Sequence, residues 1–218
     1  QYDWETGALV DRGCWLDPFY NPSPNLDPQC AEVAMVIGAC FFLPRTTWLE
    51  LGGFPEWMGS IGEDMYLCCV ARLRGVAVAV APQSGYRHRQ GGSFGGNRVQ
   101  AGRLRTTFRR RHLSERNKTA TMFVCTPTWL VWPLLALHLI LLCLEGGIMA
   151  IYRCDGRIWR EIYLPVWSSV ASGWRELRAR RARVQAGRRI GLRAYARGFV
   201  LTPRKLVMVL RHGLPAVR

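Results

Sequence analysis

Two adjacent carboxylates, Glu63 and Asp64, are the residues best placed to do chemistry. They follow Gly62 and open a helical pattern that runs from Asp64 to Arg74. The exposed N–H groups and the dipole of a helix start stabilise a carboxylate as the anion, and an ionised carboxylate can take a proton from a hydroxyl as a general base. Glu63 could orient Asp64 or bind the hydroxyl. Acids are equally common here as helix caps, so the spacing leaves both interpretations open.

One histidine, His88, follows the next apolar run, residues 76–81, and lies in a basic loop. A neutral imidazole can complete the shell of a divalent metal, Mn²⁺ or Mg²⁺, whose other ligands are carboxylates. A lone histidine flanked by arginines is, however, more often a surface residue. The 218 residues contain no D-x-D triplet, so the carboxylate ligands are expected outside this chain.

Two further features could contact a substrate. The glycine-rich turn that contains Gly91, Gly92 and Ser93 could bring backbone N–H groups to a phosphate, although the same composition is typical of a flexible linker. Trp57, which precedes the acidic pair, could stack on the face of a sugar or belong to the core. Neither pattern decides between its two interpretations.

The elements that would position these residues follow from the apolar pattern. Residues 33–43 and 76–81 are apolar runs next to a proline, which predicts two strands buried on both faces, with Gly38 marking a close approach to the backbone. Thr46 and Thr47 are expected to cap a short helix. Carboxylates at a helix start and a histidine beyond the next strand would meet at a sheet edge, where open α/β folds keep their chemistry.

The charge is divided unevenly along the chain. Residues 1–100 carry seven arginines against ten acids, whereas residues 101–218 carry twenty-three basic residues against five acids. A half this basic is expected to meet phosphate, either in nucleic acid or in anionic lipid. The eight cysteines form no C-x-x-C pair and include the adjacent Cys68 and Cys69, which indicates a reducing, cytoplasmic compartment.

An uncharged segment, residues 122–144, includes Cys125 and Cys143, which are expected to be small buried residues. Its length suffices to cross a bilayer, which needs about 20 apolar residues. Pro127 and Pro133 interrupt the segment, and both of its flanks are rich in arginine. These features favour a kinked helix or a re-entrant hairpin at the membrane interface over a true span.

Basic and aromatic residues surround this segment. Residues 97–118 form a helix-length basic stretch, and residues 158–174 carry three tryptophans and a tyrosine, which prefer the headgroup layer. Residues 175–218 alternate arginine with apolar residues, which predicts two basic amphipathic helices broken at Pro203. Such a tail is often a solvated face, but here the neighbouring apolar segment favours an anionic membrane surface and no nucleic acid.

A series of short motifs lies between residues 30 and 120. They are Gly38-Ala39, Leu51-Gly52-Gly53-Phe54-Pro55-Glu56, Glu63-Asp64-Met65-Tyr66-Leu67, Ala71-Arg72-Leu73-Arg74-Gly75, Pro82, His88 and Ser114-Glu115-Arg116-Asn117. In order and spacing they resemble the C-terminal half of a family-2 glycosyltransferase of the bacterial rhamnosyl- and galactofuranosyl-transferase type.

The resemblance implies an α/β fold. Residues 1–120 would form the acceptor-side part of a GT-A fold, the nucleotide-diphospho-sugar transferase fold. A helical, membrane-associated C-terminal tail would follow, with apolar and aromatic helices over residues 121–174 and a basic amphipathic tail over residues 175–218. The first nucleotide-binding strands and the D-x-D segment would precede Gln1, so the chain alone is expected to be inactive.

The resemblance also implies roles for the matching residues. Asp64 matches the base that deprotonates an acceptor hydroxyl for direct, inverting displacement at the anomeric carbon of the sugar. His88 matches the histidine that joins the D-x-D carboxylates around a divalent metal. The turn at 91–93 matches a loop near the donor diphosphate, and Gly38 and Ala39 match positions expected to contact substrate. Departures at residues 55 and 58–59, where the family has an acid and an aromatic pair, alter the expected acceptor pocket.

The expected function is the transfer of a sugar from a nucleotide-sugar donor to a glycan or polyprenyl-linked acceptor in cell-surface glycan synthesis. The expected location is the cytoplasmic face of the inner membrane, with an anionic membrane surface as a partner. Two alternatives stay open: a non-catalytic basic membrane-binding protein, and an inactive or partial transferase subunit.

Overall fold

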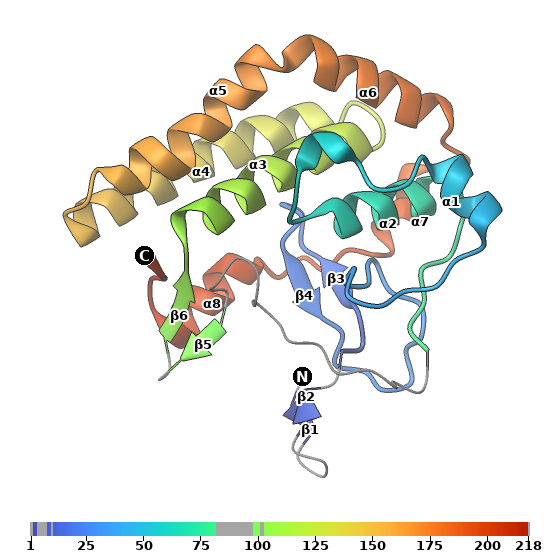
Figure 1. Cartoon of the computed structure of the whole chain (residues 1–218), viewed down its shortest axis with the longest axis horizontal. Helices are drawn as coiled ribbons and strands as arrows, with labels where there is room; N and C mark the ends of the chain where they lie inside the picture. Colours follow the sequence, from blue (N-terminus) through green and yellow to red (C-terminus); the bar gives the residue numbers. More distant parts are fainter. Residues whose placement is uncertain (1, 4–7, 10, 82–97, 101–102, 218) are drawn as a thin grey trace.

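The computed structural model describes residues 2–3, 8–9, 11–81, 98–100 and 103–217, and these are mostly helical (Figure 1). The strands in this part of the chain are two to four residues long. A helix-rich chain is therefore found where an α/β sheet was expected, and no GT-A fold is evident in the described residues.

The strands form three small sheets. Two are antiparallel pairs, and the third joins one antiparallel and one parallel pairing. The pairs are β1 (Tyr2–Asp3) with β2 (Ala8–Leu9), β3 (Cys14–Leu16) with β4 (Pro22–Pro24), and β5 (Arg98–Gln100) with β6 (Arg103–Thr106), which also pairs with β7 (Ala216–Val217).

The two predicted buried strands are wrong as continuous strands. In residues 33–43 the chain pairs with β3 through one isolated bridge, Cys14 with Met35, and turns at Gly38. In residues 76–81 one bridge joins Ala79 to Glu32. The two runs still lie side by side, because the N–H of Val33 donates to the carbonyl of Val78 at 2.9 Å. The apolar composition of the two runs predicted that they are partly buried. It did not predict that only a few of their residues pair with the backbone of a neighbouring segment.

Among the described residues, three short helices precede the basic half: α1 (Arg45–Leu51), the 3₁₀ turn η1 (Glu56–Met58) and α2 (Glu63–Leu73). Gly52 ends α1 with φ +83°, a left-handed conformation that suits glycine. The predicted threonine cap is wrong, because Pro44 precedes the first turn and no side chain caps it. The helix predicted at the acidic pair is confirmed as α2, whose interior is almost entirely buried.

The basic half is a series of helices. The predicted basic helix over residues 97–118 starts later, at Phe108, where the Thr107 hydroxyl accepts the N–H of Arg110 at 3.2 Å. The helices are α3 (Phe108–Cys125), α4 (Val131–Arg153), the π-helical turn η2 (Ile158–Tyr163), α5 (Leu164–Ser172), α6 (Trp174–Ala186), α7 (Leu192–Ala196) and α8 (Arg204–His212).

The uncharged segment 122–144 is divided between two helices. Its first residues end α3, and the rest belongs to α4, which continues unbroken for 23 residues. Pro127 lies in the connection, and Pro133 lies in the first turn of α4, where a missing N–H breaks no hydrogen bond. The kinked helix or re-entrant hairpin is thus replaced by two helices. By length and composition α4 could cross a membrane, although core helices of soluble proteins can pass the same criterion.

The helices pack in layers around a shared core. Helices α5 and α6 arch over α3 and α4, and α2 packs beneath α3 (Figure 1). The main core joins α2 and α3 to the β3–β4 hairpin and to Tyr195 of α7. All eight cysteines are free. Cys125 is buried as predicted, and so are Cys68 and Cys69 of α2, whereas the predicted burial of Cys143 is wrong, because Cys143 is exposed on α4.

Candidate functional site

A cavity of about 640 Å³ lies where the start of α2 meets α3, α8 and the β3–β4 hairpin. Both predicted acids, Glu63 and Asp64, line it, and so do Arg110 of α3 and Arg204 of α8. We call this cavity the Asp64 cleft. Its volume is within the range of small-molecule sites.

Backbone N–H groups hold the Asp64 carboxylate in place. Its Oδ2 accepts the N–H of Gly38 at 3.0 Å, and its Oδ1 accepts the N–H of Met65 at 2.7 Å. A Cβ added at Gly38 would lie 3.3 Å from the Cβ of Asp64. The close approach predicted at Gly38 is therefore found, and the approaching group is the acid itself. Ala39 follows in the same turn.

The two acids carry charges that the surrounding protein compensates poorly. Burial raises the pKa of Asp64, against the opposing effect of its backbone hydrogen bonds. Burial also raises the pKa of Glu63, and the Oε2 of Glu63 is buried with no hydrogen-bond partner in the described part of the chain. Burial lowers the pKa of Arg110, although the negative charges of Asp64 and Glu63 act to raise it. The pair is thus desolvated beside a partly desolvated cation.

A strained loop presents the acids, and Asn117 of α3 secures it. Ile61 has φ +69° and Gly62 has φ +93°. The side-chain amide of Asn117 donates to the carbonyls of Met58, Ser60 and Ile61 at 3.1, 2.9 and 2.7 Å.

Arg116 supports the same loop. Its Nη2 donates to the Met58 carbonyl at 2.6 Å, and its Nε donates to the Oδ1 of Asn117 at 2.9 Å. Arg116-Asn117 was one of the motifs in the resemblance, and the structure gives the pair a positioning role: it orients the turn from which α2 starts.

The opposite wall of the cleft is a buried ion network that the sequence analysis did not identify. Glu115 of α3 is 1% exposed, and its Oε1 and Oε2 lie 2.8 Å from Lys205 and 2.7 Å from Lys118. Lys205 also lies 2.5 Å from Glu145 of α4, and Arg111 pairs with both glutamates. One signal was available: Glu145 is the single charged residue in residues 131–152.

The network compensates its acids well. Although burial acts to raise it, the nearby Lys118, Lys205 and Arg111 hold the pKa of Glu115 well below its ordinary value. In the same way Lys205 and Arg111 lower the pKa of Glu145. Burial lowers the pKa of Lys118 to about 8 despite the neighbouring Glu115. These groups tie α3, α4 and α8 together.

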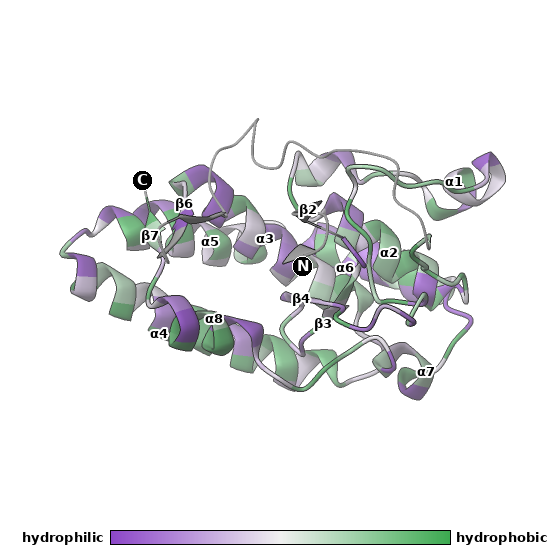
Figure 2. Ribbon diagram, turned by 90° about the horizontal axis from the view of Figure 1, so that it is seen from below, coloured by the Kyte–Doolittle hydropathy of each residue, from purple (hydrophilic) through white to green (hydrophobic). Residues whose placement is uncertain are grey.

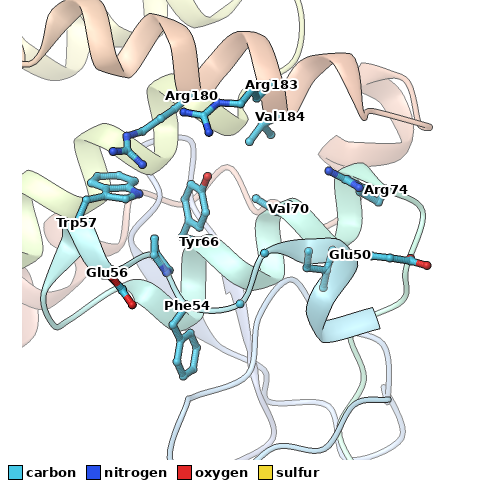
Figure 3. Close-up of a pocket in the computed structure, with 14 residues that line it drawn as sticks. Glu50, Phe54, Glu56, Trp57, Tyr66, Val70, Arg74, Arg180, Arg183 and Val184 are labelled. Atoms are coloured by element: carbon cyan, nitrogen blue, oxygen red, sulfur yellow. The ribbon is translucent and has the colours of Figure 1, made fainter. Parts of the chain in front are cut away.

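Trp57 lies in a different cavity from the acids. This second cavity, of about 600 Å³, lies between the loop before α2, one face of α2 and α6 (Figure 3). The guanidinium carbon of Arg180 sits 4.6 Å from the centre of the Trp57 ring, and Tyr66 packs edge-on against it at 5.8 Å. One face of the ring is therefore covered, and the structure does not bring Trp57 together with Asp64 in the same cavity.

The remaining predicted site residues, His88, Gly91, Gly92 and Ser93, lie outside the described residues. Within the described ranges no three His, Cys, Asp or Glu side chains come together as a metal-binding group. The predicted metal, with His88 as a ligand, stays a prediction.

No family model, no curated protein and no solved structure matches the chain.

Proposed function

We propose that the chain is the acceptor-side part of an inverting GT-A glycosyltransferase and that Asp64 is its general base. The transferase would move a sugar from a nucleotide-sugar donor to a lipid-linked or polysaccharide acceptor in cell-surface glycan synthesis. One observation carries the proposal: the Asp64 carboxylate is fixed by two backbone N–H groups at a helix start, in the wall of a cleft of about 640 Å³. The glycosyltransferase-like motif order supports it.

The chemistry asked of Asp64 is one proton transfer. The acceptor O–H gives its proton to the carboxylate while its oxygen attacks the anomeric carbon of the sugar. The bond between that carbon and the leaving diphosphate oxygen breaks on the opposite face, so the configuration inverts. Burial raises the pKa of Asp64, and a carboxylate with a higher pKa is a stronger base. A general base works best when its pKa is near the working pH.

Other groups of the cleft have matching roles in this proposal. The unpartnered Oε2 of Glu63 would accept a second hydroxyl of the acceptor. Arg110 and Arg204 would attract the negative diphosphate, because guanidinium groups bind phosphate oxygens in pairs. The cleft also has apolar lining from Met35, Met65 and other side chains, which suits an acceptor with an apolar part.

The test is the Asp64→Asn variant of the transferase that contains this chain, assayed as transfer of radiolabelled sugar in membranes of expressing cells. Removing a general base is expected to lower the rate by about 10²–10⁴-fold, while donor binding measured by titration stays nearly unchanged. The exposed Asp27→Asn variant is the matched control. Equal transfer by Asp64→Asn would reject the assignment of the base.

A second candidate function is favoured by the apolar surface of α4: a basic membrane-binding protein or a non-catalytic transferase subunit. Several large apolar side chains of α4 are exposed, as in helices that lie on membranes. Vesicle binding by the wild type, with no transfer under any donor and acceptor tried, would favour this candidate.

A further inference from the structure

One face of α4 is apolar and open to solvent for most of the helix. Seven of its large apolar side chains are 40–79% exposed and fall on one side of the helix: Leu137, Ile140, Leu141, Leu144, Ile148, Ile151 and Tyr152. A helix on the surface of a soluble protein normally turns charged and polar residues outward. The length of α4, 23 residues, corresponds to about 35 Å, so this surface is far larger than a scattered exposed leucine.

The other face of α4 is packed on the protein. Val131, Leu135, His138, Leu142, Gly146 and Met149 are buried, at the three- and four-residue spacing of a single helix face. A Cβ at Gly146 would lie 2.7 Å from atoms of Trp159 and Tyr163, so η2 sits directly against the helix backbone. Helix α4 is therefore packed along its length against the rest of the protein.

Glu145 prevents α4 from standing across a bilayer in this arrangement. It lies in the second half of the helix and pairs with Lys205 and Arg111. A span would place hydrocarbon around the whole helix, including this ion network and the charged helix α3 beside it. A charged side chain at the centre of a bilayer costs at least about 2.5 kcal/mol. Contact with lipid along the exposed face alone leaves every one of these pairs intact.

Helix α8 extends the apolar face. It joins α4 through the Lys205–Glu145 pair. Just after α8, the carbonyls of Leu214 and Pro215 accept hydrogen bonds from the Nη2 of Arg153, at the end of α4, at 3.1 and 3.2 Å. Leu206 and Leu210, one helical turn apart, are 56% and 77% exposed. Figure 2 shows α4 and α8 along the same edge of the molecule.

We propose that this α4–α8 face, formed by the exposed apolar side chains of α4 together with Leu206 and Leu210, binds in the plane of an anionic bilayer. The helices lie parallel to the membrane with their apolar side chains about 5–10 Å below the headgroups. Exposed Arg153 and Arg211 flank the face, and the net charge of +15 favours anionic lipid. The proposal stands on exposure and contacts and does not require the proposed enzymatic activity.

The orientation has a consequence for the Asp64 cleft, and this consequence does rest on the proposed function. Lys205, Met208 and Val209 of α8 line the cleft, while Leu206 and Leu210 face outward. One helix thus separates the cleft from the bilayer. An acceptor anchored in lipid can then present its sugar end to Asp64, so lipid-linked acceptors are expected to be used in preference to soluble glycans.

The first experiment is flotation of the 218-residue chain with phosphatidylcholine vesicles, with and without phosphatidylglycerol. The wild type is expected to float with anionic vesicles. The double variant Ile140→Gln/Leu144→Gln is expected to partition about thirtyfold less, since each change removes a half-exposed apolar side chain from the lipid. Leu49→Gln, at a 62% exposed site on α1, is the matched control and should bind like the wild type.

The second experiment separates an in-plane helix from a span. A fluorophore is attached to Leu144→Cys or to Ile151→Cys, each in a background where the exposed Cys40, Cys143 and Cys154 are replaced by serine. Both positions lie on the exposed face of α4, where Leu144 and Ile151 are 56% and 79% exposed. Quenchers at known depths in the lipid then locate each label. The in-plane arrangement places both labels at the same shallow depth, whereas a span places Leu144→Cys near the midplane and Ile151→Cys near the headgroups.

Three outcomes would overturn the proposal. They are no flotation of the wild type, flotation that Ile140→Gln/Leu144→Gln leaves unchanged, and labels at different depths. A dimer in vesicle-free solution that the double variant dissociates, with no flotation, would assign the face to a second copy of the chain. Vesicle binding by this chain, with no transfer activity in the transferase that contains it, would leave this proposal standing and count against the proposed function, so the two can fail separately.

Discussion

Glu115 and Asp64 line the same cleft, but their charges are compensated in different ways. Glu115 is surrounded by two lysines and an arginine, which hold its pKa well below the ordinary value. Asp64 has hydrogen bonds from backbone N–H groups and no ion pair among the described residues, and burial raises its pKa. On one wall of the cleft Glu115 is paired with cations. On the other wall Asp64 has no ion pair among the described residues, so its carboxylate can take up a proton.

This difference separates a structural role from a chemical one. A buried carboxylate with a full set of cations is committed to them and is a poor general base, because its basicity is low. The backbone N–H groups that hold Asp64 also act to lower its pKa, but burial outweighs them, so the carboxylate keeps both its geometry and a raised basicity. Perturbed acids of the second kind are candidates for function, which is why the proposed mechanism uses Asp64 and not Glu115.

The largest effect is expected from Glu115→Gln. The change leaves Lys118, Lys205 and Arg111 with fewer negative partners in a buried site, and breaking a buried ion network in this way costs about 3–5 kcal/mol. Urea unfolding of the purified chain measures the loss. Glu176→Gln, which breaks an exposed pair with Arg180, is the control and should cost less than about 1 kcal/mol. Equal losses of unfolding free energy in Glu115→Gln and Glu176→Gln would show that the buried network stabilises the protein no more than an exposed ion pair, which would contradict the structural role of Glu115.

Asn117→Ala is expected to have the next largest effect. It deletes the amide that donates to three carbonyls of the loop before α2, and buried groups left unpaired cost about 1–3 kcal/mol. Without these hydrogen bonds the loop no longer fixes the position of Asp64. The transfer rate should therefore fall by a larger factor than the loss of folded protein alone would cause. Measuring the free energy of unfolding and the transfer rate on the same variant checks this. A loss of stability with an unchanged transfer rate would contradict the positioning role.

Gly38→Ala should displace the Asp64 carboxylate without affecting the ion network around Glu115. The new Cβ would lie 3.3 Å from the Cβ of Asp64, so the carboxylate must shift, at a cost of about 1–3 kcal/mol for overpacking. Transfer is expected to fall while the ion network stays intact. In α4, a Cβ at Gly147 meets no atom within 4 Å, so Gly147→Ala is the control and should stabilise the helix by about 1 kcal/mol. Unchanged transfer in Gly38→Ala would show that the close approach does not position Asp64.

The acid wall could be predicted from the sequence, whereas the ion network could not. Glu63 and Asp64 are neighbours at a helix start that Gly62 and the apolar pattern mark, so local rules suffice. Glu115, Glu145 and Lys205 are far apart in the sequence, and only the packing of α3, α4 and α8 brings them together.

The sheet was mispredicted for a related reason. The apolar runs 33–43 and 76–81 have strand-like composition, but most of their residues lack a neighbouring strand. Strand formation depends on a partner elsewhere in the chain, which composition does not reveal. Helix α2 was better anticipated because helical hydrogen bonds are local, and its ends differ from the predicted ones by a single residue. Helix α3 begins well after residue 97, and the segment 122–144 is divided between α3 and α4.

The smallest expected effect concerns how the stabilities of Asp64→Asn and Glu115→Gln, each relative to the wild type, change with pH. Because the pKa of Asp64 is raised on folding, the contribution of Asp64 to stability is present below its unfolded pKa and is lost as the pH rises through the folded value. Asp64→Asn lacks this loss, so its stability relative to the wild type should increase as the pH rises above about 4, the ordinary pKa of an aspartate.

The pKa of Glu115 is lowered on folding, so its contribution is present above the unfolded pKa and is lost as the pH falls through the folded value. The cost of Glu115→Gln should therefore shrink toward acid pH, opposite in direction to the effect of Asp64→Asn. Urea unfolding of the wild type and both variants from acid to neutral pH checks the signs. Parallel pH profiles for the two variants would mean that folding shifts the pKa of Asp64 in the same direction as that of Glu115. The raised basicity that supports Asp64 as the general base would then be absent.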